Sequence, residues 1–361
     1  MDGSSEPTKV GRGAQIRPAN RFESIHLESD WEQLSEEDSA EQSSQKVQTS
    51  YYVDDSKSIV SQNSSPDVPF NFSMNPYRGC VHGCSYCYAR PGHEYLGLDA
   101  GLDFESKILV KLQAAKLFRT WLCKASWQCE PIALSGVTDC YQPAERHFRI
   151  TRSLIEVAVE ASQPLTVITK NRLITRDLDL LANLAADNLV HAAVSITSLD
   201  QGLTKQLEPR TSAPAARLQA IRELTEVGVP VSVMVAPVIP GLNDQEIPAI
   251  LEQAAAHGAT AAGYVMLRLP LTVEPIFIDW LQRFRPLQAD KVISRLRSVR
   301  AGELNESQFG QRMRGTGVMA NQLAQLFDVF AKKHNLAKRL PPLDCSKFVP
   351  PASPDGQLRL F

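Results

Sequence analysis

Three absences narrow the classes of protein to which this sequence can belong. It contains no apolar run of the roughly 18 residues that a membrane-spanning helix needs. Residues 1–6 have neither the basic nor the apolar region of a secretory signal peptide. The formal net charge of −2 gives no overall excess of positive charge that would indicate binding to nucleic acid. We therefore expect a cytoplasmic protein that does not contact membranes.

The sequence also lacks the even set of cysteines from which disulfide frameworks are built. It has seven, and three of them lie within residues 80–87. An odd and clustered set suits metal binding in a reducing compartment better than disulfide bonding. The hydrophobic fraction of 43% and the charged fraction of 22% are ordinary for a globular protein, and 361 residues suffice for one large domain with appendages or for two domains.

The cysteine cluster reads Cys80-Val81-His82-Gly83-Cys84-Ser85-Tyr86-Cys87. Thiolates bind soft metals and hold iron–sulfur clusters. Three protein ligands leave one iron of a four-iron cluster open to another ligand, and Gly79 and Gly83 permit the positive-φ backbone that a tight wrap needs. A closed zinc site needs four ligands. The alternative is therefore a zinc site completed by His82, His93 or a distant cysteine.

The spacing C-x3-C-x2-C, with Tyr86 just before the last cysteine, resembles the signature of radical S-adenosylmethionine (SAM) enzymes. The surrounding residues 75–91 resemble one branch of that family, the DNA repair photolyase-like relatives of spore photoproduct lyase. The resemblance implies that Cys80, Cys84 and Cys87 hold a 4Fe–4S cluster whose open iron binds the amino and carboxylate groups of SAM. It also implies that an electron from the cluster cleaves SAM to methionine and a 5′-deoxyadenosyl radical.

Strands and helices are expected to alternate through the middle of the chain. The apolar pattern predicts strands over 68–72, 131–135, 165–169, 190–196, 229–236 and 261–267. It predicts helices over 104–123, 150–161, 173–186, 213–227 and 245–257. This alternation favours an α/β fold with a parallel sheet, and it matches the partial (β/α)6 TIM-type barrel that the resemblance implies. In such barrels the chemistry lies at the carboxyl ends of the strands.

Composition divides the chain into four parts. Residues 1–66 are an acidic, largely disordered tail, and residues 67–275 form the core barrel. Residues 276–345 are a basic helical C-terminal extension, and residues 346–361 are a flexible end. Between residues 23 and 55 there are ten acidic residues and one basic residue, a local net charge of 1 − 10 = −9. Residues 11–23 resemble a segment of the same family branch. The resemblance suggests that this segment docks on the barrel, whereas its composition alone predicts coil.

The resemblance assigns SAM contacts to side chains that follow the strands. An ammonium group needs hydrogen-bond acceptors, and Thr138 and Asp139 are assigned to the SAM amino group. Glu145, in the same loop, is expected either to join them or to cap the helix that follows. Lys170 is assigned to the SAM carboxylate, with a solvated lysine as the alternative. Tyr86 is placed near the adenine, with simple core packing as the alternative.

Three further SAM contacts come from later strands. Ser195 is assigned to the ribose. Arg210 is either a second clamp for the SAM carboxylate or the ion-pair partner of Glu208. Backbone groups at Ala236 are expected to meet the adenine, because the proline and glycine residues that follow make a rigid, closely approaching loop.

Cys140 is the candidate catalytic residue. Spore photoproduct lyase uses a cysteine after its second strand as a hydrogen-atom donor, but the matching position here is Gly136, and Cys140 lies four residues further on. The alternative for Cys140 is an uninvolved small hydrophobic residue. The resemblance therefore predicts that this chain has the radical-generating apparatus, but it does not predict the lyase activity on thymine photodimers.

The chain ends in Gln-Leu-Arg-Leu-Phe, which looks like the peptide by which bacterial repair proteins bind the replication sliding clamp. Gln357 would be the polar anchor, and the apolar groove would take Leu358, Leu360 and Phe361; the alternative is that these side chains fold back on the protein itself. Residues 279–339 hold twelve Lys and Arg against five Asp and Glu, which suits DNA phosphates or a solvated helix face.

Three hypotheses for function follow. The first is a radical SAM enzyme that acts on DNA or a nucleotide-related substrate in a repair-type reaction. The second keeps the radical enzyme but gives it a peptide or a small metabolite as substrate. The third is a non-catalytic, DNA-associated metal-binding protein. Either enzyme requires an electron donor such as flavodoxin or ferredoxin.

Overall fold

The computed structural model describes residues 11–22 and 47–352. Its main sheet has seven strands in the order β10-β9-β8-β7-β6-β3-β2. Their bounds are β2 Val60–Gln62, β3 Phe72–Met74, β6 Ile132–Leu134, β7 Leu165–Thr169, β8 Val190–Ser195, β9 Val231–Val238 and β10 Ala261–Met266. The six strands from β3 to β10 are parallel, and β2 adds to the β3 edge in the antiparallel direction. The predicted partial six-stranded α/β barrel is confirmed.

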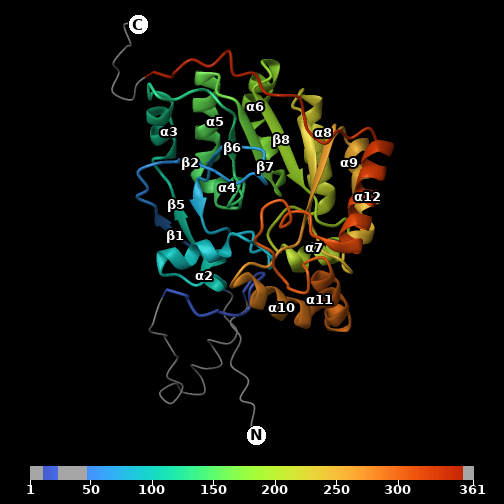
Figure 1. Cartoon of the computed structure of the whole chain (residues 1–361). Coiled ribbons are helices and arrows are strands. Elements are labelled where there is room, and N and C mark those ends of the chain that lie inside the picture. Colours follow the sequence, from blue (N-terminus) through green and yellow to red (C-terminus); the bar gives the residue numbers. More distant parts are fainter. Residues whose placement is uncertain (1–10, 23–46, 353–361) are drawn as a thin grey trace, which may run out of the picture.

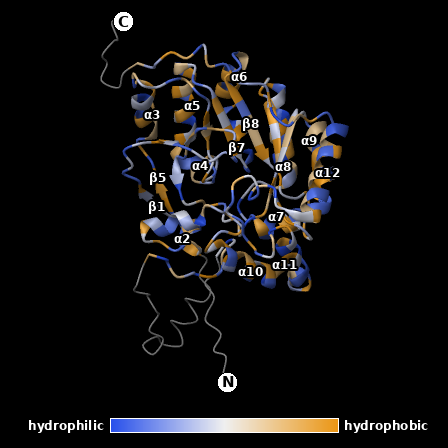
Figure 2. Ribbon diagram, viewed as in Figure 1, coloured by the Kyte–Doolittle hydropathy of each residue, from blue (hydrophilic) through white to orange (hydrophobic). Residues whose placement is uncertain are grey.

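The strands form where the sequence has β-branched and apolar residues. In β7 buried and half-buried residues alternate along Leu165–Thr169, as expected of a strand whose two faces have different surroundings. In β8 all but one residue is buried, which is typical of a parallel strand covered on both faces. Figure 2 shows hydrophobic residues concentrated in strands such as β8.

Helices cover the outer side of the sheet and alternate with its strands (Figure 1). They are α3 Ala114–Leu122, α5 Ile150–Ala161, α6 Leu178–Ala186, α8 Pro214–Glu226 and α9 Ile247–Ala256. Helix α8 ends just before Gly228, whose φ of +85° allows the chain to turn back into the sheet. The β8 strand ends at the same side of the molecule as α7 Gln201–Leu207 (Figure 1).

The structure corrects three expectations, and it contains a second, three-stranded sheet. Strands β1 Ser50–Val53, β4 Tyr77–Arg78 and β5 Lys107–Val110 form it in the order β1-β5-β4. The expected helix over 104–123 is wrong, because α2 Leu102–Ser106 ends before β5 and α3 begins after it. The expected strand over 68–72 lies later, at β3. Strands β1 and β2 also lie within the expected disordered tail, where pairing with β5 and β3 orders them.

The C-terminal region packs against the β10 edge of the sheet and against α9, and its residues 310–313 reach Asp67 near β3. It contains α10 Val273–Phe284, α11 Ala289–Ser298 and α12 Gly317–Lys333. At the β10 edge, the Met266 N–H donates to the Met313 carbonyl at 2.9 Å and the Ala262 N–H donates to the Ala337 carbonyl at 2.9 Å. Arg312 forms an ion pair with Asp67, which precedes β3. This ion pair therefore connects the two ends of the open row of parallel strands.

Among the described residues, no helix is long and apolar enough to cross a membrane. The expected clamp-binding peptide lies outside the described residues, and its role stays a prediction. The expected domain boundaries also stay predictions. Trp280 of α10 is fully buried and its indole N–H donates to the Gln206 carbonyl at 2.9 Å, so the extension packs tightly on the barrel.

Candidate active site

The three cysteines of the motif lie in one loop, residues 79–89, which we call the cluster loop. It follows β4 and lies beside the carboxyl ends of the parallel strands. Its backbone turns at Gly79 and Gly83, whose φ angles of +77° and +65° favour glycine. The first turn is fixed by the Cys80 N–H, which donates to the Phe104 carbonyl at 2.9 Å.

Burial controls the ionisation of these thiols. It raises the pKa of Cys80 to about 12 and raises the pKa of Cys84 and of Cys87 above the ordinary value. Backbone N–H groups of His82 and Asp139 that face the Cys80 sulfur lower its pKa in part. The deprotonated thiols need nearby positive charge to stabilise them, and the surrounding protein groups supply only part of it. Iron ions would supply the rest. The donor set therefore fits a 4Fe–4S cluster with three protein ligands.

The cluster loop rests on a buried ion pair. Arg90 and Glu105 are at most 1% exposed, and Arg90 Nη2 lies 2.8 Å from Glu105 Oε2. The remaining guanidinium N–H groups donate to the carbonyls of Cys84, Ala100 and Gly101 at 2.8–3.0 Å. Because every donor of this rigid, planar group has an acceptor, Arg90 fixes the path of the loop around Cys84.

Residues 11–22 form an irregular segment, which we call the strap, that lies against the cluster loop. The backbone N–H groups of Arg12 and Gly13 donate to the Glu105 carboxylate. A Cβ atom on Gly13 would overlap the Gly83 carbonyl oxygen, so a glycine is needed for this close backbone approach. The docking that the resemblance suggested is confirmed, and the strap lies beside α2 in Figure 1.

An acidic pair next to the strap leads to a prediction about pH. Burial and the neighbouring charge of Asp103 raise the pKa of Asp99 to about 6. A raised carboxyl pKa means that the folded state binds more protons than the unfolded state, so this contribution to stability grows as pH falls from about 6 to about 4. We expect Asp99→Asn to raise the free energy of unfolding above pH 7 by about 1–3 kcal/mol, because the amide oxygen keeps the contact to the Gly101 N–H.

Urea unfolding at pH 7.5 and pH 4.5 checks this expectation. The gain of Asp99→Asn over the natural protein should shrink at the lower pH. Asp99→Ala is the control, because it removes both the charge and the acceptor for the Gly101 and Asp103 N–H groups. An equal gain for Asp99→Asn at the two pH values would contradict the raised pKa.

The alternative zinc site is not supported. His82 Nε2 lies 3.1 Å from Asn171 Nδ2, and His82 Nδ1 lies 3.5 Å from an Asp139 carboxylate oxygen. His93 Nε2 lies 3.0 Å from the Lys107 carbonyl oxygen. In the part of the chain that the structure describes, no three His, Cys, Asp or Glu side chains gather closely enough to hold a metal ion. A four-iron cluster has no such need, because each thiolate binds a different iron.

Glu208 is a buried carboxylate that contacts two of the expected SAM residues, Tyr86 and Lys170. It accepts hydrogen bonds from the Tyr86 hydroxyl and from Arg217, and from Thr197 Oγ1 at 2.5 Å. Lys170 Nζ lies 3.2 Å from its Oε1. Burial alone would raise the pKa of Glu208, but the charges of Arg217 and Lys170 outweigh it and hold the pKa well below its ordinary value.

Lys170 is held inside the barrel and is not a solvated lysine. Its side chain is 17% exposed, and its Nζ donates to the Ala236 carbonyl at 2.7 Å. It also lies 5.8 Å from the centre of the Tyr86 ring. Three residues that were expected to contact SAM, on three separate segments, therefore come together: Tyr86, Lys170 and Ala236.

Thr138 and Asp139 follow β6, and both are engaged with the protein. The Asp139 carboxylate accepts from Thr169 Oγ1 at 2.8 Å and from the Lys170 N–H at 2.7 Å. It thereby ties the loop after β6 to the end of β7. The Thr138 hydroxyl donates to the Tyr77 carbonyl at 2.8 Å, and its assignment to the SAM amino group stays a prediction.

Ser195 and Arg210 lie at the carboxyl side of β8. The Ser195 carbonyl accepts from Arg217 at 3.0 Å, and the Ser195 side chain is 6% exposed. Arg210 is exposed, and its backbone N–H donates to the His82 carbonyl at 3.3 Å. The alternative ion pair of Arg210 with Glu208 is wrong, because Arg217 and Lys170 take that carboxylate.

Glu145 caps the helix that follows it, as one of its two interpretations predicted. It is fully buried, and its carboxylate accepts the Thr151 N–H at 3.0 Å in the first turn of α5. It also accepts from the Tyr77 hydroxyl at 2.5 Å and from Arg176 at 2.8 Å. Its oxygens are therefore used within the protein.

Cys140 lies in the hydrophobic core and not in the site. It is fully buried, and its sulfur faces the carbonyls of Leu134 at 4.0 Å and Ile168 at 3.9 Å, between β6 and β7. A hydrogen-atom donor must reach the substrate. The prediction that Cys140 is catalytic therefore lacks the access that the role requires, and the alternative of a small core residue agrees with its packing.

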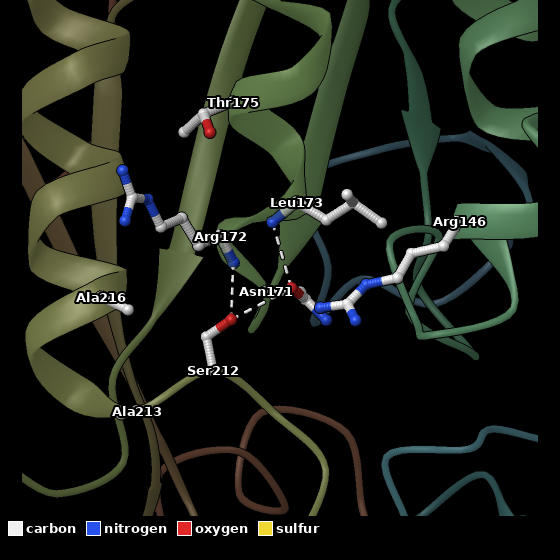
Figure 3. A pocket seen from close by; sticks show the side chains of 8 residues that line it. All are labelled: Arg146, Asn171, Arg172, Leu173, Thr175, Ser212, Ala213 and Ala216. Carbon is white, nitrogen blue, oxygen red and sulfur yellow. Dashed lines mark hydrogen bonds between the residues drawn. The ribbon is translucent and has the colours of Figure 1, made fainter.

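A surface pocket of about 420 Å³ opens beside this site (Figure 3). Arg146 and Arg172 lie on two sides of Asn171, whose Oδ1 accepts from the Leu173 N–H and from Ser212 Oγ at 3.0 Å each. The Asn171 amide also contacts His82 of the cluster loop. The Asn171 side chain therefore lines the pocket on one side and contacts the cluster loop on the other.

Sequence reasoning missed the charged groups that support the site. Arg90, Glu105, Arg217 and the strap residue Arg12 were not singled out, because charged residues are usually exposed and nothing local marks these as buried. Glu208 was considered only as a partner of Arg210. For the strap, the resemblance was the single signal.

Comparisons with known proteins agree with this geometry. The family model described as Radical SAM superfamily matches residues 74–254. An uncharacterised protein of Mycobacterium tuberculosis is 38% identical over 234 residues, which cover 64% of this chain and 68% of that protein. A protein of Pseudomonas phage M6 named Radical SAM Nalpha-GlyT isomerase is 26% identical over 214 residues, which cover 58% of this chain and 42% of that protein.

Among solved structures, spore photoproduct lyase complexed with dinucleoside spore photoproduct is similar, with a TM-score of 0.58 at 16% identity over 79% of each chain. At this identity the likeness shows a shared fold. The family match spans half of the chain, and it sets aside the hypothesis of a non-catalytic metal-binding protein. The protein belongs to the radical SAM superfamily, as an enzyme whose cofactors are a 4Fe–4S cluster and SAM.

Proposed function

We propose that the substrate of this radical SAM enzyme is DNA or a nucleotide-related molecule. The observation that carries the proposal is the pocket beside the cluster loop, where the guanidinium groups of Arg146 and Arg172 flank Asn171 (Figure 3). Arg146 is exposed and, among the described residues, has no carboxylate partner, whereas Arg172 pairs with Glu223 at the rim. Guanidinium groups so placed suit phosphate oxygens.

A second feature suits a nucleobase. Tyr88 follows the last cluster cysteine, is 44% exposed, and its hydroxyl donates to the Gly136 carbonyl. Arg268, which follows β10, lies 5.1 Å from the centre of the Tyr88 ring. Aromatic rings and guanidinium planes are the groups on which bases stack. Because Tyr88 belongs to the cluster loop, a base stacked on it would lie near Cys87.

The comparisons support the same substrate class. The structural neighbour spore photoproduct lyase was solved with a dinucleoside spore photoproduct. Its name describes a lyase, and the phage relative is named an isomerase, so the proposal concerns the substrate and not the reaction. A peptide or small metabolite stays the second candidate.

When bound, the cluster supplies the electron that cleaves SAM to methionine and a 5′-deoxyadenosyl radical. The residues proposed to hold and orient SAM are Tyr86, Thr138, Asp139, Lys170, Ser195, Arg210 and Ala236. Flavodoxin or ferredoxin is the proposed electron donor, and the cytoplasm is the proposed location, where a reducing environment suits seven cysteines of which three are clustered.

The salt dependence of DNA binding tests the phosphate pocket. We expect oligonucleotide binding to the natural protein to weaken with added salt. Each phosphate contact contributes about 0.7–0.9 to the slope of log K against log salt, so the double variant Arg146→Gln/Arg172→Gln should reduce the size of that slope by about 1.4–1.8. Fluorescence anisotropy over roughly 50–300 mM KCl measures this slope. Lys116→Gln/Lys124→Gln, on exposed residues outside the basic region 279–339, is the charge-matched control.

Deuterium transfer identifies the substrate directly. The reconstituted enzyme is reduced in the presence of SAM and a deuterated oligonucleotide, and 5′-deoxyadenosine is analysed by mass spectrometry. Deuterium in that product supports the proposal. Unlabelled 5′-deoxyadenosine together with an unchanged salt slope in the double variant would overturn it in favour of another substrate.

A further inference from the structure

The side chain of Arg12 lies across the cluster loop. A Cβ atom built on Gly83 would lie 2.7 Å from Arg12 Cβ and 3.4 Å from Arg12 Cδ. Gly83 stands between the cysteine ligands Cys80 and Cys84, so the strap places this guanidinium group beside the part of the chain that wraps the cluster. Thr49 Oγ1 accepts one hydrogen bond from Arg12 Nη2.

Within residues 11–22 and 47–352, the rest of the Arg12 guanidinium group has no acceptor. Its Nε and Nη1 atoms are buried and have no hydrogen-bond partner among the described residues. The nearby carboxylate of Glu105 accepts instead from the Arg90 guanidinium and from the backbone of Arg12 and Gly13. Buried donors without acceptors are costly, by about 1–3 kcal/mol each. The arrangement therefore calls for a further acceptor at this place.

The surroundings decide which acceptor fits. The two N–H-bearing atoms are shielded from solvent, so an exchangeable ion from solution is a poor candidate. Among the surrounding charges, that of Arg210 repels Arg12, whereas negative charge on Glu105, on Tyr51 and on Cys80 attracts it. Burial, with that repulsion, lowers the pKa of Arg12 to about 10, well above neutral pH, so the group remains charged. A cluster held by three thiolates is the anion that this position offers.

We propose that Arg12 is a positioning residue for the 4Fe–4S cluster, donating from the strap to the sulfur atoms at Cys80 and raising the reduction potential of the cluster. A cation beside the cluster stabilises the reduced form, which carries one more negative charge, relative to the oxidised form. The strap also covers the cluster loop, so it slows the access of oxygen to the iron. The strap is thereby part of the electron-accepting centre.

Redox titration of the anaerobically reconstituted full-length protein, followed by electron paramagnetic resonance, tests this inference. We expect Arg12→Gln to shift the midpoint of the cluster to a more negative potential and Arg12→Lys to stay close to the natural protein. Arg17→Gln is the matched control on the same strap, because Arg17 is 54% exposed and faces Asp99 and Asp103. It should leave the midpoint unchanged.

A second readout separates the charge from the covering role of the strap. Gly13→Val should displace the strap, because its side chain would overlap Gly83, and should speed the loss of cluster absorbance in air severalfold. Hydrogen exchange of residues 79–89 reports whether the strap is docked in each variant. If Arg12→Gln keeps the strap docked and the midpoint unchanged, the inference is wrong. If Arg12→Gln displaces the strap, a midpoint of Arg12→Lys as negative as that of Arg12→Gln overturns it.

Discussion

Replacement of Cys84 by alanine is expected to abolish iron binding and SAM cleavage together. Cys84 is a buried thiol in the middle of the cluster loop, and its carbonyl is fixed by Arg90. With two remaining thiolates, a four-iron cluster loses one of its three protein ligands. After anaerobic reconstitution, iron and sulfide content and the amount of 5′-deoxyadenosine formed under reduction measure the effect, and both should fall to background.

Cys123→Ala is the matched control, because Cys123 is a half-buried thiol whose sulfur lies 3.3 Å from the Pro351 carbonyl oxygen, outside the cluster loop. It should keep full iron content and activity. Loss of iron in Cys123→Ala equal to that in Cys84→Ala would show that the motif is not the ligand set. Retention of a complete cluster in Cys84→Ala would do the same.

Removal of the Glu208 carboxylate is expected to cost about 3–5 kcal/mol of the free energy of unfolding. Glu208→Ala leaves the buried Arg217, which is 1% exposed, and the half-buried Lys170 without their counter-charge. It also leaves the Tyr86 hydroxyl without its acceptor. Urea unfolding of the protein before cluster reconstitution measures the loss, and a filter-binding assay with labelled SAM after reconstitution measures the effect on the site.

A surface ion pair provides the comparison. Glu160 pairs with Arg119 between α5 and α3, and both side chains are 30% or more exposed. Exposed pairs contribute about 0–1 kcal/mol, so Glu160→Ala should have little effect. Glu208→Gln keeps one carbonyl acceptor, so its loss in the free energy of unfolding should lie between those of Glu208→Ala and Glu160→Ala. A loss in Glu208→Ala no larger than that in Glu160→Ala would contradict the central role of this carboxylate.

The repeating core of the fold could be predicted from local patterns. The helix over 150–161 and the strand over 165–169 agree with α5 and β7 at both ends. Their apolar residues follow the periods of a helix and of a strand over several residues. The pattern failed at residues 107–110, because β5 is held by pairing with β1 and β4, at distant positions in the sequence.

The sequence predicted those parts of the site whose chemistry depends on an uncommon residue type. Cys80, Cys84 and Cys87 are recognisable because only a few residue types hold soft metals. Glu105 was not, since its role depends on Arg90, fifteen positions earlier, and on the strap, more than ninety positions earlier. Cys140 shows the opposite error. Its residue type suggested chemistry, and its place between β6 and β7 determines that it packs instead.

Residues of the C-terminal region protect the outer edge of β10, so the barrel should not be stable in solution without that region. A fragment cut at residue 275 would remove Met313 and Ala337, which occupy the outer hydrogen-bonding groups of β10, and would leave Asp67 without Arg312. A bare, apolar edge strand is a template for pairing between molecules. Such a fragment should precipitate or form oligomers, so studies by dissection should retain the helical region together with the sheet that it protects.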